Sequence, residues 1–133
     1  MATKPKTAES PTTATVKADA KTAPTPQSMR RYPRYPADVR LSVQVFRSGN
    51  VVSLWGHSNE IGEDGVGGTL TGPLEVGEVV SMEMTLPLAA QPIKLRALVR
   101  YRSGLRHGFE FLAVSQQQRD ILRRVCEMLS NQL

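Results

Sequence analysis

The chain has 133 residues, a formal net charge of +5 and a single cysteine. This length suits one ordinary domain, and one cysteine excludes an internal disulfide and a thiolate-rich metal site. No apolar run approaches the length of a membrane span, and none follows the N-terminal lysines, so we expect no membrane span, no secretory signal and a cytoplasmic protein.

Residues 1–28 differ in composition from everything that follows. They are rich in Thr, Ala and Pro and contain no aromatic residue. A segment with so little to bury cannot offset the entropy lost on ordering, so we expect a disordered tail here and one domain over residues 29–133. The domain keeps a mild positive excess, interspersed with acids, which permits an anionic ligand or surface.

After Pro36 the sequence alternates between apolar and polar residues, which predicts β-strands. We expect strands over residues 39–45, 51–57, 66–70, 79–86, 93–102 and 107–114. The first two should pair as a hairpin around a tight turn at residues 48–50. In the fifth strand, Tyr101 is expected to face inward with the apolar residues. Residues 58–68 are expected to form a loop, whose glycines suit positive φ or close backbone approach.

The last segment follows a helical period instead. Ser115 and Gln118 have the spacing of a capping box, and the apolar residues after them recur at helical spacing: Ile121, Leu122, Val125 and Leu129. The predicted fold class is therefore mainly β. It is a six-stranded antiparallel, split β-barrel with a C-terminal α-helix, preceded by the disordered tail.

Catalytic and metal chemistry have little support in the sequence. His57 and His107 lie far apart, which favours structural or surface roles, and Cys126 lies beside the apolar stripe of the helix, which favours packing. The acidic residues within 60–64 lack the ligand spacing of a calcium site and are best interpreted as solvated turn residues. The nearby glycines are not followed by the Lys-Ser/Thr pair of a P-loop. We expect no catalytic residue, no metal and no cofactor.

Two motifs remain. The first is Arg30-x-x-x-Arg34, in a segment that Pro33 and Pro36 keep extended. Arginine pairs bidentately with phosphate and stacks on bases, although a basic linker with solvated charges would look the same. The second is Glu60-Ile61-Gly62-Glu63-Asp64-Gly65, which lies between the second and third predicted strands.

Together with the strand order and the closing helix, these motifs resemble the PilZ domain family. Its members carry an Arg-x-x-x-Arg linker followed by an Asp/Asn-x-Ser-x-x-Gly loop. The resemblance covers roughly residue 29 to the C-terminus and includes Arg100-Tyr101-Arg102 and the strand Gly108-Phe109-Glu110-Phe111. It implies a bacterial, non-enzymatic receptor for the second messenger cyclic di-GMP (c-di-GMP).

Transferred to this sequence, the resemblance implies that the ligand-binding residues are Arg30, Arg34, Glu60, Gly62 and Gly65, with Arg31 assisting. Glu60 stands where the family has Asp or Asn, and it can still accept hydrogen bonds from guanine. Gly62 stands where the family has Ser, so one hydrogen bond is lost, worth about 0.5–1.5 kcal/mol.

Three hypotheses therefore follow from the sequence. In the leading one, c-di-GMP draws the arginine segment onto the barrel and alters the surface offered to an effector protein. In the second, a degenerate PilZ domain binds no nucleotide and acts as a protein–protein adaptor. In the third, the tail and linker bind nucleic acid or anionic lipid with steep salt dependence; the acids of the barrel argue against it, so we expect no specific nucleic-acid partner. An enzyme comes last.

Overall fold

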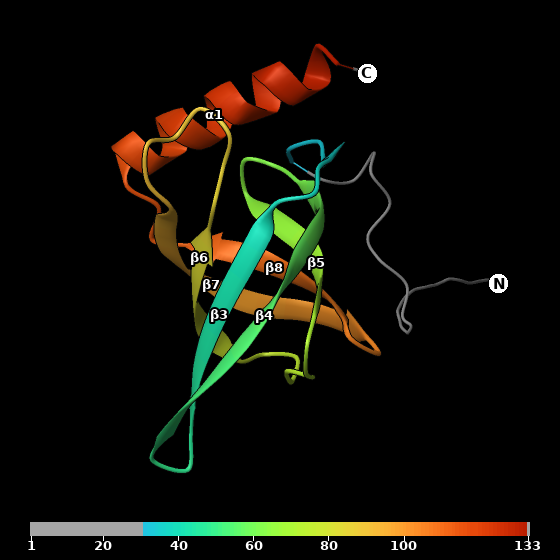
Figure 1. The fold of residues 1–133 in the computed structure, drawn as a ribbon, viewed down its shortest axis with the longest axis vertical. Helices are drawn as coiled ribbons and strands as arrows, with labels where there is room; N and C mark the ends of the chain where they lie inside the picture. Colours follow the sequence, from blue (N-terminus) through green and yellow to red (C-terminus); the bar gives the residue numbers. More distant parts are fainter. Residues whose placement is uncertain (1–30, 133) are drawn as a thin grey trace, which may run out of the picture.

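The computed structural model describes residues 31–132, so the predicted tail and Arg30 lie outside the described residues. Its elements, shown in Figure 1, are β2 (Tyr35–Pro36), β3 (Arg40–Arg47), β4 (Asn50–Ile61), β5 (Gly65–Leu70), β6 (Val79–Met84), β7 (Ile93–Ser103), β8 (Arg106–Leu112) and α1 (Gln116–Ser130).

The strands form one antiparallel sheet that closes on itself. The order is β2-β4-β3-β6-β7-β8-β5, and a further pairing of β5 with β4 completes the ring. The six longer strands make the barrel, while the short β2 adds to β4 beyond the end of β3. α1 lies across one end of the barrel, and the β3–β4 turn projects from the opposite end (Figure 1). The predicted six-stranded barrel with a C-terminal helix is confirmed.

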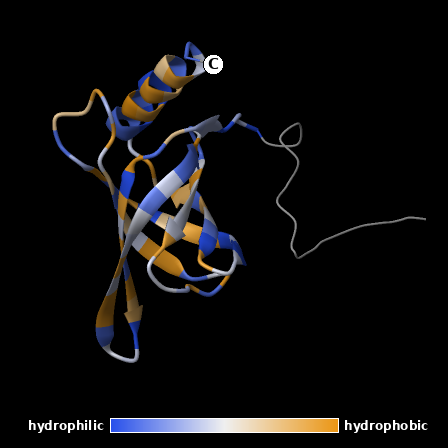
Figure 2. Cartoon of the chain, turned by 45° about the vertical axis from the view of Figure 1, so that its right-hand side comes forward, coloured by the Kyte–Doolittle hydropathy of each residue, from blue (hydrophilic) through white to orange (hydrophobic). Residues whose placement is uncertain are grey.

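The core follows the alternation that the sequence predicted. Apolar side chains such as Leu41, Met82 and Phe109 point into the barrel and are fully buried, because successive residues of a strand face opposite sides of the sheet. From α1, Leu122 and Val125 pack onto the same core. Figure 2 shows apolar and polar residues interleaved along the strands and along α1. Burial of this apolar surface is the main stabilising contribution to the fold.

The capping box of α1 is confirmed. The Gln118 backbone N–H donates to Ser115 Oγ (3.1 Å), and the Ser115 N–H donates to Gln118 Oε1 (3.1 Å). These two bonds satisfy donors that a helix N-terminus otherwise leaves unpaired. Within the described part of the chain, no helix has the length and apolar character needed to cross a membrane.

The predicted loop over residues 58–68 is wrong for most of its length. β4 continues to Ile61 and β5 begins at Gly65, so the turn is only three residues long. The alternation of apolar and polar side chains that marks a strand could not be recognised here, because glycine has no side chain. The glycines of this stretch do not adopt positive φ. These glycines instead allow the close backbone approach that we also expected. A β-carbon on Gly68 would lie 2.7 Å from the His57 carbonyl oxygen of the neighbouring strand.

Two β-bulges change which side chains face outward. One lies in β4 between Ser58 and Glu60, and the other lies in β7 between Val99 and Tyr101. A bulge adds one residue to a strand and therefore reverses the facing of the residues after it. As a result Ser58 is buried but Glu60 faces outward, and Val99 is buried but Tyr101 faces outward. The inward orientation predicted for Tyr101 is wrong for this reason.

Candidate functional site

The side chain of Arg34 lies over the turn between β4 and β5. A β-carbon on Gly62 would lie 2.7 Å from Arg34 Cδ, and one on Gly65 would lie 2.7 Å from Arg34 Nη2. Real β-carbons are almost never so close to another heavy atom, so both positions must be glycine for Arg34 to lie where it does. The Arg34 side chain is consequently only 11% exposed.

Two carboxylates flank the guanidinium of Arg34. Glu60 Oε2 lies 3.5 Å from Nη1, and Asp64 Oδ1 lies 3.6 Å from Nε. Nη1 donates a long hydrogen bond to Glu60 Oε2, whereas the contact between Nε and Asp64 Oδ1 is an ion pair. The interpretation of Glu60 and Asp64 as solvated turn acids is wrong, because Arg34 folds down between them.

Glu60 is also one end of a row of residues that crosses four strands. In register, Glu60 of β4 is paired with Gly67 of β5, Gly67 with Gly108 of β8, and Gly108 with Tyr101 of β7. The two bulges bring Glu60 and Tyr101 onto the outer face at the two ends of this row. The outer face at Gly67 and Gly108 therefore has no side chain of its own, and a carboxylate and an aromatic ring from the neighbouring strands lie over it.

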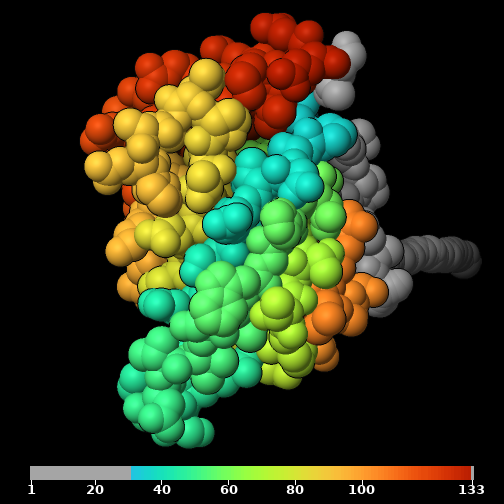
Figure 3. Space-filling view, viewed as in Figure 1, coloured from blue at the N-terminus to red at the C-terminus, as the bar shows by residue number. Residues whose placement is uncertain are grey.

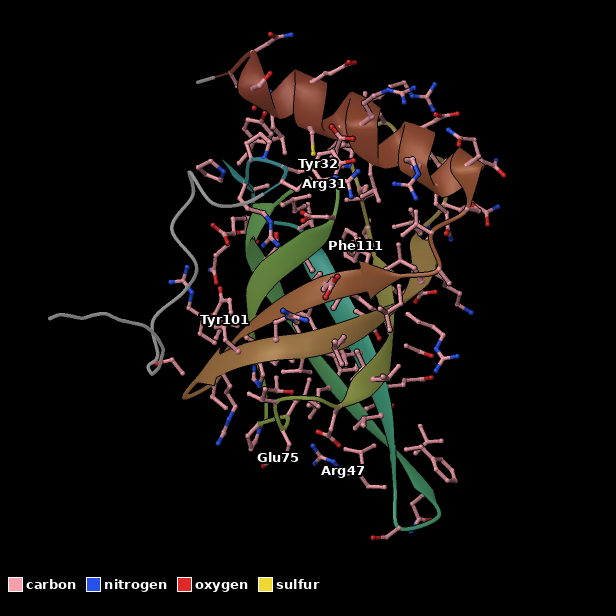
Figure 4. All side chains as sticks on the ribbon, turned by 180° about the vertical axis from the view of Figure 1, so that it is seen from behind. Arg31, Tyr32, Arg47, Glu75, Tyr101 and Phe111 are labelled. Atoms are coloured by element: carbon pink, nitrogen blue, oxygen red, sulfur yellow. The ribbon has the colours of Figure 1, made fainter. Side chains whose placement is uncertain are left out.

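The Tyr101 ring lies flat across Gly108, because a β-carbon on Gly108 would overlap the ring atoms. A β-carbon on Gly67 would lie 3.5 Å from the Tyr101 hydroxyl and 3.3 Å from Glu60 Oε2, so the hydroxyl and the carboxylate both lie close to Gly67. Figure 4 labels Tyr101 beside the end of β7. A flat ring and a carboxylate over bare backbone suit a planar ligand with hydrogen-bond donors at its edge. The sequence analysis did not assign Tyr101 to the site, although the resemblance included Arg100-Tyr101-Arg102.

The structure thus brings together four of the residues predicted for the site: Arg34, Glu60, Gly62 and Gly65. Arg31 is exposed, and its guanidinium carbon lies 5.6 Å from the centre of the Tyr32 ring, within the range of a cation–π contact. Figure 4 shows both side chains at the end of the barrel that α1 covers. Arg30 lies outside the described residues.

His107 and Cys126 are buried, whereas His57 is exposed and pairs with Asp38. His107 is fully buried; its Nε2 accepts the Leu74 N–H (3.0 Å) and its Nδ1 lies 2.8 Å from the Leu105 carbonyl oxygen. Burial lowers the pKa of His107 and raises the pKa of the Cys126 thiol to about 11. Among residues 31–132, no group of three or more His, Cys, Asp or Glu side chains could hold a metal ion.

Comparison with known proteins gives a family and a fold. The family model described as PilZ domain matches residues 28–128. A sequence search of curated proteins found no match. The PilZ domain of YcgR from Escherichia coli with c-di-GMP is 20% identical, with a TM-score of 0.62 over 78% of this chain and 93% of that chain.

Two further solved structures share the fold. The inhibitor of motility MotI/DgrA from Bacillus subtilis is 19% identical, with a TM-score of 0.60 over 79% of this chain and 53% of that chain. The PilZ domain of CeSA from a cellulose-synthesizing bacterium is 18% identical, with a TM-score of 0.55 over 71% and 96%. At these identities the likeness concerns the fold.

Proposed function

The chain belongs to the PilZ domain family, and on that premise we propose that it is a non-enzymatic receptor for c-di-GMP. The observation that carries the proposal is the contact between the two motifs: Arg34 of the linker lies against Gly62 and Gly65 of the second motif. The E. coli YcgR structures similar to this chain contain c-di-GMP. A receptor of this kind acts in the bacterial cytoplasm, which is part of the proposal.

The proposed roles follow from the chemistry of each side chain. Arg34, with Arg30 and Arg31 before it, donates charge-assisted hydrogen bonds to the phosphates. Glu60 accepts hydrogen bonds from the N–H groups at the edge of a guanine. Gly62 and Gly65 let the linker and the ligand approach the backbone.

Tyr101 completes the proposed site at the other end of the cross-strand row. Its ring offers a stacking face to a guanine, because every base presents a flat π-face to an aromatic ring. The facing glycines on β5 and β8 leave room for the ring itself, since a β-carbon on Gly108 would overlap it.

Ligand binding would act on a partner through the linker. Arg34 already lies against the barrel, so the ligand would draw the residues before it, among them the exposed Arg31, onto the barrel. This would change the surface that precedes β2, which is the surface proposed for an effector protein. Ordering such a segment costs a few kcal/mol, which the charge-assisted contacts must offset.

A second candidate function is a protein–protein adaptor that binds no nucleotide. It is favoured by one specific observation: two carboxylates of the protein already flank Arg34, whose side chain is 11% exposed. A ligand phosphate would have to compete with Glu60 and Asp64 for the same guanidinium.

Titration calorimetry of the full chain distinguishes these functions. A receptor binds c-di-GMP with saturation and does not bind GTP at the same concentration. An adaptor gives no heat with either nucleotide. A general anion binder responds to both and loses affinity steeply as salt is raised.

A further inference from the structure

The β3–β4 hairpin extends beyond the barrel as an arm, which we define as residues 45–53. β5 pairs with β4 only from Gly56 to Ile61, and β6 pairs with β3 only from Leu41 to Gln44. Among the described residues, no strand pairs with the other edge of residues 50–53. Figure 1 shows the arm projecting from the barrel, and Figure 3 shows it as a protrusion of the surface.

The hydrogen bonds of Trp55, next to the arm, show which backbone groups of the arm point along its free edge. The Trp55 N–H donates to Thr71 Oγ1 (3.2 Å), and its carbonyl accepts the Thr71 N–H (2.8 Å), so both groups of Trp55 point away from β3. Backbone groups alternate in direction along a strand. The N–H and C=O groups of Val51 and Ser53 therefore point the same way, along the free edge.

The edge lacks the features that usually prevent strands from pairing. Residues 50–55 read Asn-Val-Val-Ser-Leu-Trp, with no charged residue, no proline and no glycine. Natural proteins protect an exposed edge with such residues, with a bulge or with a covering segment. Val51, at 61%, and Trp55, at 55%, are also far more exposed than most large apolar side chains of the chain.

The outer face of the arm is apolar, and the arm carries no unpaired charge. Phe46 is 70% exposed and pairs directly with Val51 across the hairpin, so the two side chains lie together on that face. The nearest cation, Arg47, is already bound by Glu78 through two hydrogen bonds of 2.7 and 3.0 Å. Two arms can therefore pair edge to edge without repulsion between like charges.

We propose that the free edge of the arm is a homodimer interface, in which the arms of two copies of this chain pair as antiparallel strands about a two-fold axis. Val51 of one copy is paired with Ser53 of the other, so that each donates and accepts, and the two Val52 residues face each other at the axis. A second copy fits because an antiparallel edge is complementary to itself and this edge carries no charge. Only Val51 and Ser53 of each copy supply backbone hydrogen bonds to this pairing, so we expect an association that is weak and depends on concentration.

Sedimentation of the full chain over a range of concentrations tests the proposal. The wild type should shift from monomer to dimer as concentration rises, and Val51→Lys should weaken the association by about tenfold or more, since an edge lysine is the usual protection. Val76→Lys is the matched control, because Val76 is also 61% exposed but lies outside the arm; it should behave as the wild type. A monomeric wild type, or a dimer insensitive to Val51→Lys, overturns the proposal.

A cross-link tests the pairing itself. Val52→Cys should form a disulfide-linked dimer under mild oxidation, because facing residues in a non-hydrogen-bonded pair lie about 4.5 Å apart at Cα. The native Cys126 is buried and should not react. Val76→Cys should stay monomeric. Equal cross-linking of both variants would contradict the dimer. So would a chain that binds an added extended peptide on this edge but does not self-associate, because the edge would then be a peptide-binding site.

Discussion

Arg34 occupies the space that a side chain on Gly62 would need. A β-carbon at position 62 would lie 2.7 Å from Arg34 Cδ and 2.8 Å from the Pro33 carbonyl oxygen. The family motif has Ser at this position, so the glycine of this chain and the buried position of its arginine belong together. The structure leaves no space at position 62 for the serine that the resemblance places there.

Restoring the family residue by Gly62→Ser should destabilise the protein by about 1–3 kcal/mol, because it overpacks a filled space. Urea unfolding measures the change. Removing the arginine side chain relieves part of the clash, so the effects of Gly62→Ser and Arg34→Ala should not add in the double variant. Additive effects would mean that Arg34 does not fill the space beside residue 62.

Tyr101 should contribute to nucleotide affinity through its ring. Tyr101→Ala should weaken c-di-GMP binding by about 1–3 kcal/mol, the usual contribution of stacking a base on an aromatic side chain. Tyr101→Phe keeps the ring and should bind nearly as the wild type does. The measurement is calorimetry on both variants, with thermal unfolding to check their stability. Wild-type affinity in Tyr101→Ala would exclude the ring from the site.

Acidification should destabilise the fold through His107. Its Nε2 accepts the Leu74 N–H, so Nδ1 carries the proton and the buried ring must be neutral. Because burial lowers the pKa of His107 in the folded state, the unfolded chain binds more protons below its ordinary value of 6.5. Stability is then complete above pH 6.5 and is lost as the pH falls towards the folded pKa, by at most about 1.4 kcal/mol per pH unit.

Urea unfolding at about pH 7.5 and about pH 5.5 measures this effect, because these values lie about one unit above and below the ordinary pKa of histidine. The comparison is with His107→Gln, which cannot gain a charge in this range and should lose less stability over the same interval. His57 is exposed and pairs with Asp38, so His57→Gln is a control for the other histidine. An equal loss in His107→Gln and the wild type would assign the acid sensitivity to other groups.

Much of the fold could be predicted from the sequence, because the spacing of apolar side chains along a strand or a helix indicates which face is buried. Val39 to Val45 and the stretch around Met82 alternate clearly, and Ser115 with Gln118 marks the helix start. The alternation did not predict the strand at Gly65, Gly67 and Gly68, because these residues have no side chains. There a long β4 and a three-residue turn took the place of the predicted loop.

The site was less predictable than the fold. The resemblance to the PilZ family implied that Arg34 and Glu60 belong to one site, but not that Glu60 and Asp64 pair with the arginine. That contact depends on the bulge in β4, which turns Glu60 outward, and on the absence of side chains at Gly62 and Gly65. The bulge in β7 likewise turned Tyr101 outward against the simple alternation. A one-residue bulge leaves no composition signal, yet it reverses which residues can meet a ligand.

Calorimetry of matched charge deletions tests whether Arg34 binds the phosphate of c-di-GMP. Arg34→Ala is compared with Arg123→Ala, which removes the same charge from the surface of α1, where Arg123 pairs with Asp120. We predict saturable binding by the wild type and by Arg123→Ala, and a loss of about 1.5–3 kcal/mol in Arg34→Ala. Equal affinity in all three proteins, or no binding by the wild type, would contradict the proposed receptor.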